Sequence, residues 1–225
     1  FKASQYLVIR IPTLDPTAHR SYSICSAPYE QVIAIGVKKV EGGKISTFLC
    51  NQAKEGDEIE LMTPQGHFIL PDNIELKSVV AFVSGSGITP VISIIKQLLK
   101  KNQTKVALFY GNKSRSDIMF DQELKSLEDT YAPRLEVNHI FSREQMGLPD
   151  LEGRISSEKL ERWKSYLFDA RSTDTFLLCG PGNMVHHLEA TLLSYHISSS
   201  KIFTELFSSP VESEGKPIIE TKSQS

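Results

Sequence analysis

Apolar and polar residues alternate over short stretches in the first third of the chain, the period of a β-strand with one buried face. Turn-forming residues such as Gly42-Gly43 and Pro64-Gln65-Gly66 separate these stretches, and one short helix is predicted over 45–53. The predicted strands, which are rich in β-branched and aromatic residues or alternate in polarity, are 4–11, 30–40 and 57–62. Short strands at this spacing indicate a small antiparallel barrel.

From about residue 76 the pattern changes to apolar strands that alternate with amphipathic helices. The predicted strands are residues 78–84, 105–111, 135–141, 175–180 and 201–207. The predicted helices are residues 90–101, 117–128, 156–167 and 183–195. The predicted fold is therefore β plus α/β: an antiparallel barrel followed by a doubly wound parallel sheet, whose ligand sites lie at the carboxyl ends of the strands.

The composition excludes several classes of protein. The 225 residues include 25 basic and 27 acidic side chains, a formal net charge of −2, which argues against a general nucleic-acid binder. No apolar run reaches the length of a membrane span. Three cysteines without a C-x-x-C spacing are too few for an iron–sulfur cluster held by four thiolates, and they fit a reducing compartment. We expect a soluble cytoplasmic protein that binds neither nucleic acid nor membrane.

The two ends of the chain suggest a part of something longer. The chain opens directly on a strand-like segment, and residues 208–225 have the polar, Pro-, Gly- and Ser-bearing composition of a linker. We expect a first domain over residues 1–74, a second over 75–207 and a linker over 208–225.

A strand, a glycine turn and a helix follow one another around Gly85-Ser86-Gly87. Such a turn lets a phosphate approach the backbone, and the following helix offers free N–H groups and the positive end of its dipole. Pro90 fits the first helical turn, where its missing N–H costs nothing. The third glycine and the acidic residue of the dinucleotide fingerprint are missing, so a structural turn stays an alternative to a phosphate or dinucleotide site.

Gly180-Pro181-Gly182 forms a second turn at the end of a later strand, so we expect the backbone of both turns in one crevice. Cys179 ends that strand. A lone cysteine is usually a small buried hydrophobic residue. Two glycine turns at the same edge favour a place for it in the site.

Ser142 and Arg143 come directly after a predicted strand, and an arginine beside a hydroxyl suits a phosphate monoester, although a surface arginine is the default. Lys113 and Arg115 follow the neighbouring strand and could extend such a patch.

Ser46 follows Gly43 at a predicted helix start, where it is either the N-cap or part of a phosphate cradle. The histidines form no metal-binding pattern. His186 and His187 are adjacent on a predicted helix, so they point in different directions and we expect both on the surface.

Six motifs in order resemble those of the ferredoxin–NADP+ reductase superfamily of flavoproteins. They are Arg20-Ser21-Tyr22-Ser23 (Arg-x-Tyr-Ser), Gly43-Lys44-Ile45-Ser46 (Gly-x-x-Ser), Pro64-Gln65-Gly66-His67-Phe68 (Pro-x-Gly-x-Phe), the loop from Gly85 to Pro90, Cys179-Gly180-Pro181, and Glu205-Leu206-Phe207 (Glu-x-Phe). Each motif is weak alone, but the ordered set spans nearly the whole chain. The resemblance implies an FAD-binding barrel followed by an NAD(P)-binding domain, with a hydride passing from NADPH to FAD and single electrons leaving to a [2Fe–2S] centre.

On the flavin side, the resemblance implies that Tyr22 stacks on the isoalloxazine ring, Ser23 lies near flavin N5 and Arg20 meets the phosphate. Those residue types suit these roles, although for this stretch alone a barrel strand with a buried tyrosine is the preferred interpretation. The implied flavin-binding residues are Arg20, Ser21, Tyr22, Ser23, Val37, Lys38, Gly43, Lys44, Ile45, Ser46 and Phe207.

On the nucleotide side, the resemblance places Thr89 and Cys179 near the nicotinamide. Ser142 and Arg143 resemble the pair that holds the 2′-phosphate, which favours NADPH over NADH. The implied nucleotide-binding residues are Gly85, Ser86, Gly87, Ile88, Thr89, Pro90, Asn112, Ser142, Arg143, Cys179, Gly180 and Pro181. The implied catalytic residues are Ser23, Cys179 and Glu205, and no metal ligand is implied.

Within the superfamily, residues 20–28, residues 110–124 and the tail after Phe207 most resemble the reductase component of phenylacetyl-CoA epoxidase, an enzyme of phenylacetate degradation, and its relatives. Those reductases carry a [2Fe–2S] domain after the linker. The implied partners are therefore an iron–sulfur domain or ferredoxin and a multicomponent oxygenase. The chain departs from the family because it lacks the opening barrel strands, which makes the barrel N-terminally incomplete, and because Ser4 stands where glycine is usual.

Two other functions stay open from the sequence. One is a stand-alone flavin or ferredoxin reductase of the same fold. The other is a nucleotide-sensing module without turnover, since a fold alone does not guarantee an activity. FAD rather than FMN follows from the family only.

Overall fold

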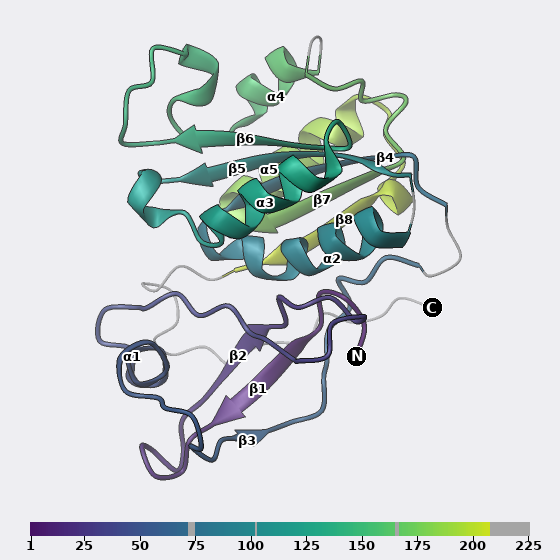
Figure 1. Ribbon diagram of the computed structural model, residues 1–225. Helices are drawn as coiled ribbons and strands as arrows, with labels where there is room; N and C mark the ends of the chain where they lie inside the picture. The colour runs from purple at the N-terminus through teal and green to yellow at the C-terminus, as the bar shows by residue number, and fades with distance from the viewer. Residues whose placement is uncertain (72–74, 102, 165–166, 208–225) are drawn as a thin grey trace.

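The computed structural model describes residues 1–71, 75–101, 103–164 and 167–207. A small antiparallel sheet with one helix lies below a larger α/β unit, and helix α2 is on the side of that unit nearest the small sheet (Figure 1). The expected linker, residues 208–225, lies outside the described residues. Among the helices that are described, none combines the length and the apolar character that a membrane crossing needs.

The first part of the chain forms a three-stranded antiparallel sheet, in the order β2-β1-β3, and one helix. The elements are β1 (Tyr6–Arg10), β2 (His19–Ser23), β3 (Glu60–Leu61) and α1 (Lys44–Asn51). Leu7 and Ile9 of β1 are buried and lie opposite Tyr22 and Arg20 of β2. They pack with Ile11, Ile24 and Ile45 in a small core. The antiparallel sheet is confirmed, and in the described residues it is open rather than a closed barrel.

The strand predicted over residues 30–40 was wrong. Among the described residues this segment makes a single bridge, Ile35 to Ile24, and its Ala34 carbonyl accepts from the N–H groups of Cys25 at 2.8 Å and Ser26 at 3.5 Å. Beyond that point it leaves the sheet and runs against the α/β unit, where Gly36 packs on Thr89. Contacts with another part of the molecule therefore override the β-propensity of the segment.

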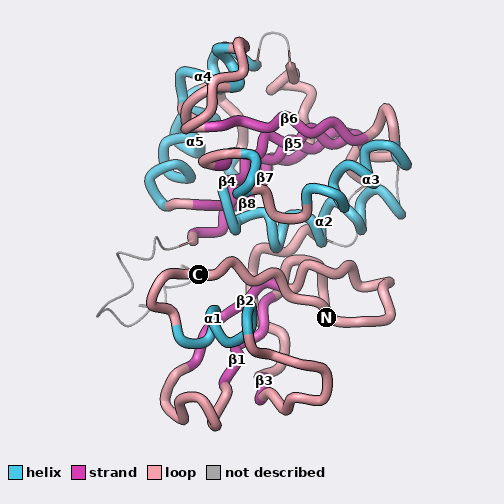
Figure 2. The backbone as a smooth tube through the Cα atoms, turned by 60° about the vertical axis from the view of Figure 1, so that its left-hand side comes forward, coloured by secondary structure: helices cyan, strands magenta, loops and turns pink. Residues whose placement is uncertain are grey.

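The second part forms a five-stranded parallel sheet in the order β6-β5-β4-β7-β8. The strands are β4 (Ser78–Ser84), β5 (Lys105–Asn112), β6 (Leu135–Phe141), β7 (Thr175–Gly180) and β8 (Ile202–Leu206). The helices are α2 (Ile88–Lys101), α3 (Asp121–Tyr131), α4 (Ser157–Trp163) and α5 (Gly182–Ser194), with 3₁₀ turns at Gly85–Gly87, Arg115–Asp117, Pro149–Leu151 and Ser199–Lys201. Helices α2 and α3 cover one face and α4 and α5 the other (Figure 2). The doubly wound sheet is confirmed.

Burial on both faces explains why the strands read as continuous apolar runs. In β4, Val79, Ala81 and Val83 pack with α2, whereas Val80 and Phe82 pack with α4 and α5. On the second face the rings of Phe82, Phe109 and Trp163 stack, with the Phe109 and Trp163 centroids 4.7 Å apart. Each buried aromatic or aliphatic side chain contributes about 1.5–3 kcal/mol, so this core holds the sheet in place.

Helix α3 begins at Asp121, four residues after the predicted start at 117. Phe120 adopts φ 61°, and Ile118 and Met119 pack against the core beneath α2 rather than continuing a helix. The apolar residues that suggested a longer helix are thus anchors of the preceding loop. Helix α2 begins at Ile88, so Pro90 does lie in its first turn, as predicted.

Ser4 has φ 72°, in the left-handed region that favours glycine. It is buried, and its hydroxyl contacts the carbonyl oxygens of Ala3 and Phe68. The backbone at this position thus has a conformation that glycine adopts without strain.

We expect Ser4→Gly to be more stable than Ser4→Ala by about 1 kcal/mol. Both changes remove the hydroxyl, but only glycine relieves the left-handed strain. Urea unfolding of both variants beside the wild type measures the difference. Equal stability of the two variants, or a more stable alanine variant, would contradict it.

Candidate cofactor-binding site

The two glycine turns interlock at the carboxyl edge of the parallel sheet. Val83 of β4 lies opposite Cys179 of β7, so both strands end at the same level. A β-carbon on Gly87 would lie 2.5 Å from the Cys179 carbonyl oxygen, closer than real β-carbons approach. The two turns can meet this closely only because Gly87 has no side chain.

The outer side of the first turn is open. Gly85 has φ +56°, and a β-carbon added there would meet no atom within 4 Å. The Thr89 hydroxyl, in the first turn of α2, donates to the Ser86 carbonyl at 2.9 Å and braces the loop from within. An open glycine turn leading into a 14-residue helix fits the approach of a phosphate group.

Tyr110 of β5 holds this loop from beneath. Its hydroxyl donates to the Gly85 carbonyl at 3.0 Å and accepts a hydrogen bond from the Met119 N–H at 3.2 Å. Burial raises the pKa of Tyr110 to about 12, so the phenol keeps its proton. Sequence reasoning missed this residue, although a tyrosine within a buried apolar strand is a signal that its hydroxyl has a partner.

Polar residues gather where β5 and β6 end. The N–H groups of Ser142 and Arg143 donate to the carbonyls of Asn112 and Lys113 at 3.0 and 2.9 Å, which aligns the two strand ends. Asn112 is 7 % exposed, and its side chain lies near the Tyr110 hydroxyl. Nevertheless, neither its Nδ2 nor its Oδ1 has a partner at hydrogen-bonding geometry among the described residues. A buried amide without partners suits a ligand that supplies them.

The basic side chains at this edge differ in whether they already contact other side chains. Arg115 pairs with Glu144, its Nε lying 3.5 Å from Oε2, and its guanidinium lies over the Phe141 ring. Lys113, Ser142 and Arg143 are exposed. Arg143 and Lys113 are therefore better placed than Arg115 to meet an anionic group beside Asn112.

Cys179, Glu205 and Phe207 meet where β7 and β8 end. The Cys179 side chain is fully buried in the core, and burial, with the nearby Glu205 charge, raises the pKa of its thiol well above the usual range. Burial also raises the pKa of Glu205, with the His67 charge acting against it. The Phe207 N–H donates to the Gly180 carbonyl at 2.9 Å, which ties the end of β8 to the second glycine turn.

The residues expected at the flavin lie on β2. Arg20 and Ser21 are exposed, Tyr22 is half-buried and Ser23 is buried. Arg20 donates through Nη1 to the neighbouring His19 carbonyl at 2.7 Å. Burial raises the pKa of Tyr22, with the Arg20 charge opposing. Tyr22 packs against the small core, so the strand presents its ring from a fixed position.

Helix α1 presents the second expected flavin segment. Gly43 is the N-cap and Ser46 the third helical residue, so the interpretation of Ser46 as an N-cap was wrong. Its hydroxyl instead accepts from the Val40 N–H at 3.2 Å and donates to the Gly43 carbonyl at 3.4 Å. Ile45 is buried in the small core, while Lys44 pairs with Asp15 at 2.7 Å.

One contact joins the two groups of residues. A β-carbon on Gly36 would lie 2.4 Å from Thr89 Cγ2, so this segment of the first part touches the first turn of α2. Val37 follows directly, and Lys38 Nζ lies 3.6 Å from Asp117 Oδ1. Sequence reasoning missed Gly36, although a single glycine inside a strand-like run is a signal of close backbone approach.

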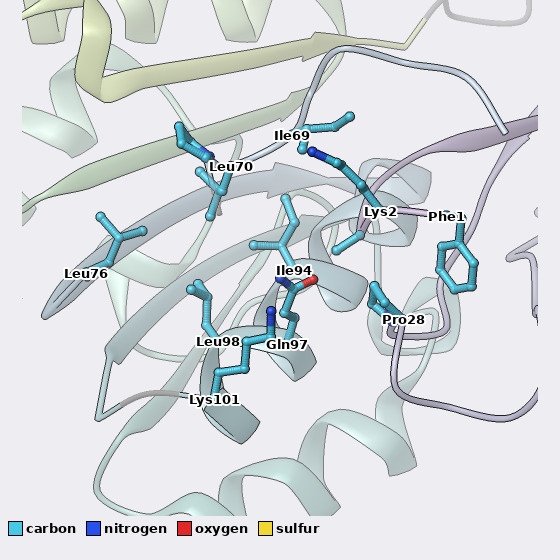
Figure 3. Close-up of a pocket in the computed structure, with 12 residues that line it drawn as sticks. Phe1, Lys2, Pro28, Ile69, Leu70, Leu76, Ile94, Gln97, Leu98 and Lys101 are labelled. Carbon is cyan, nitrogen blue, oxygen red and sulfur yellow. The ribbon is translucent and has the colours of Figure 1, made fainter. Parts of the chain in front are cut away.

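A cavity of about 280 Å³ lies elsewhere, at the amino edge of the sheet (Figure 3). It is lined mainly by apolar side chains of the first residues, of residues 69–71 and 76, and of α2 from Ile94 to Lys101. At 1.5 Å rise per residue, Ile94 lies about 10 Å along α2 from the glycine loop, and none of the lining residues is a predicted cofactor residue. The cavity is therefore separate from the candidate site.

The adjacent exposed histidines His186 and His187 lie on α5, as predicted. The cysteines Cys25, Cys50 and Cys179 are all free. Within the described residues, no group of three or more His, Cys, Asp or Glu side chains could hold a metal ion.

Comparison with known families divides the chain in the same way as the structure does. Residues 1–69 match the oxidoreductase FAD-binding domain, and residues 82–190 match the oxidoreductase NAD-binding domain.

Among curated proteins, the chain is 34% identical over 212 residues to one of the subunits of 1,2-phenylacetyl-CoA epoxidase from Escherichia coli, covering 93% of this chain and 60% of that protein. It is 29% identical over 211 residues to the ferredoxin reductase component of 3-ketosteroid-9-alpha-monooxygenase of Mycobacterium tuberculosis, covering 93% and 55%. The chain thus spans 60% or less of the length of these relatives. Among solved structures, the FAD/NAD-binding domain of nitric oxide dioxygenase from Vibrio cholerae superposes with a TM-score of 0.78 at 25% identity, covering 93% of this chain and 86% of that one.

We expect Gly87→Ala to destabilise the chain by about 3 kcal/mol, because its methyl group meets backbone atoms that cannot move aside. Gly85→Ala, the matched control, adds only left-handed strain of about 1 kcal/mol in open space. Urea unfolding measures both. A Gly87→Ala loss no larger than that of Gly85→Ala would show that the turns do not interlock.

We expect Glu205→Gln to change how stability depends on pH. Because burial raises the pKa of Glu205 above its ordinary 4.5, the folded chain holds this proton more tightly than the unfolded chain. Its stabilising contribution is complete below the unfolded pKa and is lost as the pH rises through the folded pKa. The variant should therefore gain stability relative to the wild type as the pH rises above the ordinary glutamate pKa, measured by urea unfolding. Glu41→Gln, at an exposed turn, is the control, and a parallel pH trend in both variants would refute the burial of Glu205.

Proposed function

Because this chain belongs to the ferredoxin–NADP+ reductase family of FAD- and NAD-binding oxidoreductases, we propose that it carries electrons from NADPH through FAD to a [2Fe–2S] centre. When bound, FAD accepts an electron pair and releases single electrons, so the redox chemistry belongs to the cofactor. The residues of this chain bind the two cofactors, orient them and hold protons near them.

The observation that carries this proposal is the contact of Gly36 with Thr89. Two cofactors that exchange electrons directly need their reacting rings side by side, within a few ångströms. The contact brings the segment assigned to the flavin, Val37 and Lys38, next to the loop assigned to the nucleotide. If the two cofactors did not react with each other, their binding segments would not need to be in contact.

The residues present fit both cofactors. The open space above Gly85 suits a pyrophosphate, and the partnerless amide of Asn112 suits a group with both donors and acceptors. The half-buried ring of Tyr22 suits an aromatic heterocycle. These features are independent of one another and lie on different elements.

We assign FAD to β2 and the start of α1. Tyr22 offers an aromatic face, the buried Ser23 a hydroxyl near flavin N5, and the exposed Arg20 a cation for phosphate. The N–H groups at the start of α1, after Gly43, would hold the pyrophosphate, and Lys44, which pairs with Asp15, would add a second cation.

We assign the nicotinamide to the sheet edge beside Thr89 and the Cys179 turn, near Glu205 and Phe207. Since burial raises the pKa of Glu205, this carboxyl group holds a proton at pH values where an exposed glutamate is ionised. It can then donate a hydrogen bond toward the reacting rings. The Cys179 thiol, buried in the core beneath this edge, stays neutral.

We assign the adenosine 2′-phosphate to Ser142 and Arg143, which makes NADPH the preferred donor. Arg143 is exposed and has no ion-pair partner among the described residues, whereas Arg115 is engaged by Glu144. A charge-assisted hydrogen bond from the free guanidinium favours a dianionic phosphate over a ribose hydroxyl.

We propose an iron–sulfur domain or a ferredoxin as the electron acceptor, serving a multicomponent oxygenase such as a phenylacetyl-CoA epoxidase. Two relatives are oxygenase components by name, which supports such a partner. The three free cysteines of this chain are too few for a four-thiolate cluster and suit the cytoplasm. We place the boundary between the two cofactor-binding domains near residue 74, with residues 208–225 as the linker toward the cluster.

We expect the full chain, supplemented with FAD, to show a bound-flavin absorption spectrum that bleaches under anaerobic conditions faster with NADPH than with NADH. In Arg143→Ala the preference should shrink by about tenfold, because one charge-assisted hydrogen bond to the phosphate is lost. The rate with NADH should be unchanged. Arg171→Ala, an exposed arginine in the loop before β7, is the matched control.

Each result decides a different part of the proposal. Absence of bound flavin, or bound flavin that neither nucleotide bleaches, would overturn the reductase function. Faster bleaching by NADH would keep the reductase and overturn the assignment of Ser142 and Arg143.

A further inference from the structure

A buried lysine joins the two halves of the molecule away from the glycine loops. Only 7% of the Lys96 side chain, on α2, is exposed. Its Nζ lies 3.1 Å from Glu30 Oε1 and 2.7 Å from Glu123 Oε1. Glu30 follows β2 in the first part of the chain, and Glu123 lies on α3, so one ammonium group bridges both halves.

Ser93 adds a second bond on the same face of α2, one turn earlier. Its hydroxyl donates to the Ser26 carbonyl at 2.6 Å, and both residues are buried. The Ser26 hydroxyl in turn accepts from the Ala34 N–H at 2.9 Å. The helix thus bonds directly to the backbone of the flavin-side segment, which fixes that backbone more closely than a contact between mobile side chains.

Glu30 is itself held in place. Its Oε2 accepts from the Ala27 N–H at 2.9 Å, and its own N–H donates to the Ala27 carbonyl at 2.9 Å. Lys96 therefore contacts a closed turn over residues 27–30 rather than a freely moving carboxylate.

The ion pairs of Lys96 are better suited to fixing the position of α2 relative to residues 26–30 than to raising the free energy of unfolding. Burial lowers the pKa of Lys96, but the hydrogen bonds and charges of Glu123 and Glu30 outweigh it and raise the pKa, so the group stays charged. Lys96 is buried, whereas the side chains of Glu30 and Glu123 are 31% and 39% exposed, so the ion pairs are only partly removed from water. Desolvation of the ammonium group still offsets part of the attraction. A buried charge instead penalises any displacement that separates it from its partners.

The two segments joined by Ser93 and Lys96, residues 26–30 and α2, both lie next to residues assigned to the cofactors. Ser26 lies three residues after Ser23, the last residue of β2. Helix α2 begins at Ile88, directly after the glycine loop Gly85–Gly87. A shift of α2 relative to residues 26–30 would therefore change the separation of the two assigned sites.

We propose that Lys96, with Ser93, is a positioning residue that sets the distance between the flavin-binding strand and the nucleotide loop, and through it the rate at which NADPH reduces the flavin. The proposal rests on the reductase function proposed for the chain. Lys96 belongs to neither assigned cofactor site and acts only through the 26–30 segment and α2.

The test compares Lys96→Met, Lys96→Arg and Ser93→Ala with the wild-type full chain loaded with FAD. Lys125→Met, at an exposed lysine of α3, is the matched control for the loss of a lysine. Four quantities are measured: FAD affinity, urea unfolding, the rate of flavin reduction at saturating NADPH, and its isotope effect with NADPH deuterated at C4. Reduction by dithionite, which needs no nucleotide, shows whether each variant's flavin is accessible and redox-active.

We expect Lys96→Met to slow reduction at saturating NADPH by about tenfold, since small misplacements of reacting groups cost large factors in rate. The isotope effect should rise, because the transfer step becomes more fully rate-limiting. FAD affinity and dithionite reduction should stay within about twofold, Lys96→Arg should recover most of the rate, and Ser93→Ala should lose about threefold. Lys125→Met should match the wild type.

Unchanged reduction at saturating NADPH in Lys96→Met overturns the proposal, as does a loss of rate matched by an equal loss of FAD affinity. If Lys96→Met does not fold, Ser93→Ala decides the question, and an unchanged rate there overturns it. A wild type that binds no FAD, or whose flavin NADPH does not reduce, counts against the reductase function instead, so the two failures are distinguishable.

Discussion

The backbone contact at Gly87 is the constraint on which the nucleotide-facing edge depends. β4 is the central strand and pairs with β5 on one side and β7 on the other, so the turn after it is flanked by the ends of both neighbours. Because Gly87 has no side chain, the turn packs directly against the Cys179–Gly180 peptide. Helix α2 therefore starts at the edge of the sheet. Tyr110 of β5 then fixes the other flank through the Gly85 carbonyl. The loop is thus held from both neighbouring strands while its outer surface stays open.

Contacts at separated points along α2 orient the halves of the molecule. The contact of Gly36 with Thr89 lies at the start of α2. The hydrogen bond from Ser93 to Ser26 and the ion pairs of Lys96 lie one to two turns further along the same helix. A single contact would leave the halves free to rotate about it, whereas contacts at separated points along one helix remove that rotation. Because Ser93, Ser26 and Lys96 are polar and buried, the more distant contact tolerates little displacement. The apolar core beneath α2, which includes Cys25, adds burial without comparable directionality.

The differences between pattern and structure have a common origin. Residues 30–40 have strand-like composition, yet they leave the small sheet because Gly36 packs on Thr89 and Glu30 pairs with Lys96, both on α2. The helix expected from residue 117 starts at Asp121, because Ile118 and Met119 reach the core of the α/β unit only from an irregular loop. Ser46 satisfies Val40 rather than capping α1, because Gly43 already occupies the cap. In each case a partner remote in sequence, or a neighbouring residue's backbone, outweighs a local preference.

By itself the sequence determined the strand–helix order of the α/β half, the antiparallel character of the first part and the family to which the motifs belong. These follow from periodicity and from short motifs, which are local in the chain and need no partner to be recognised. Only the tertiary structure decided that Gly36 meets Thr89, that Asn112 is buried without partners among the described residues and that Lys96 gathers Glu30 and Glu123. A charged residue on a helix is most often solvated, and nothing within a few positions of Lys96 indicates the two carboxylates that bury it. Such contacts join residues tens of positions apart, so they exist only once the chain has folded.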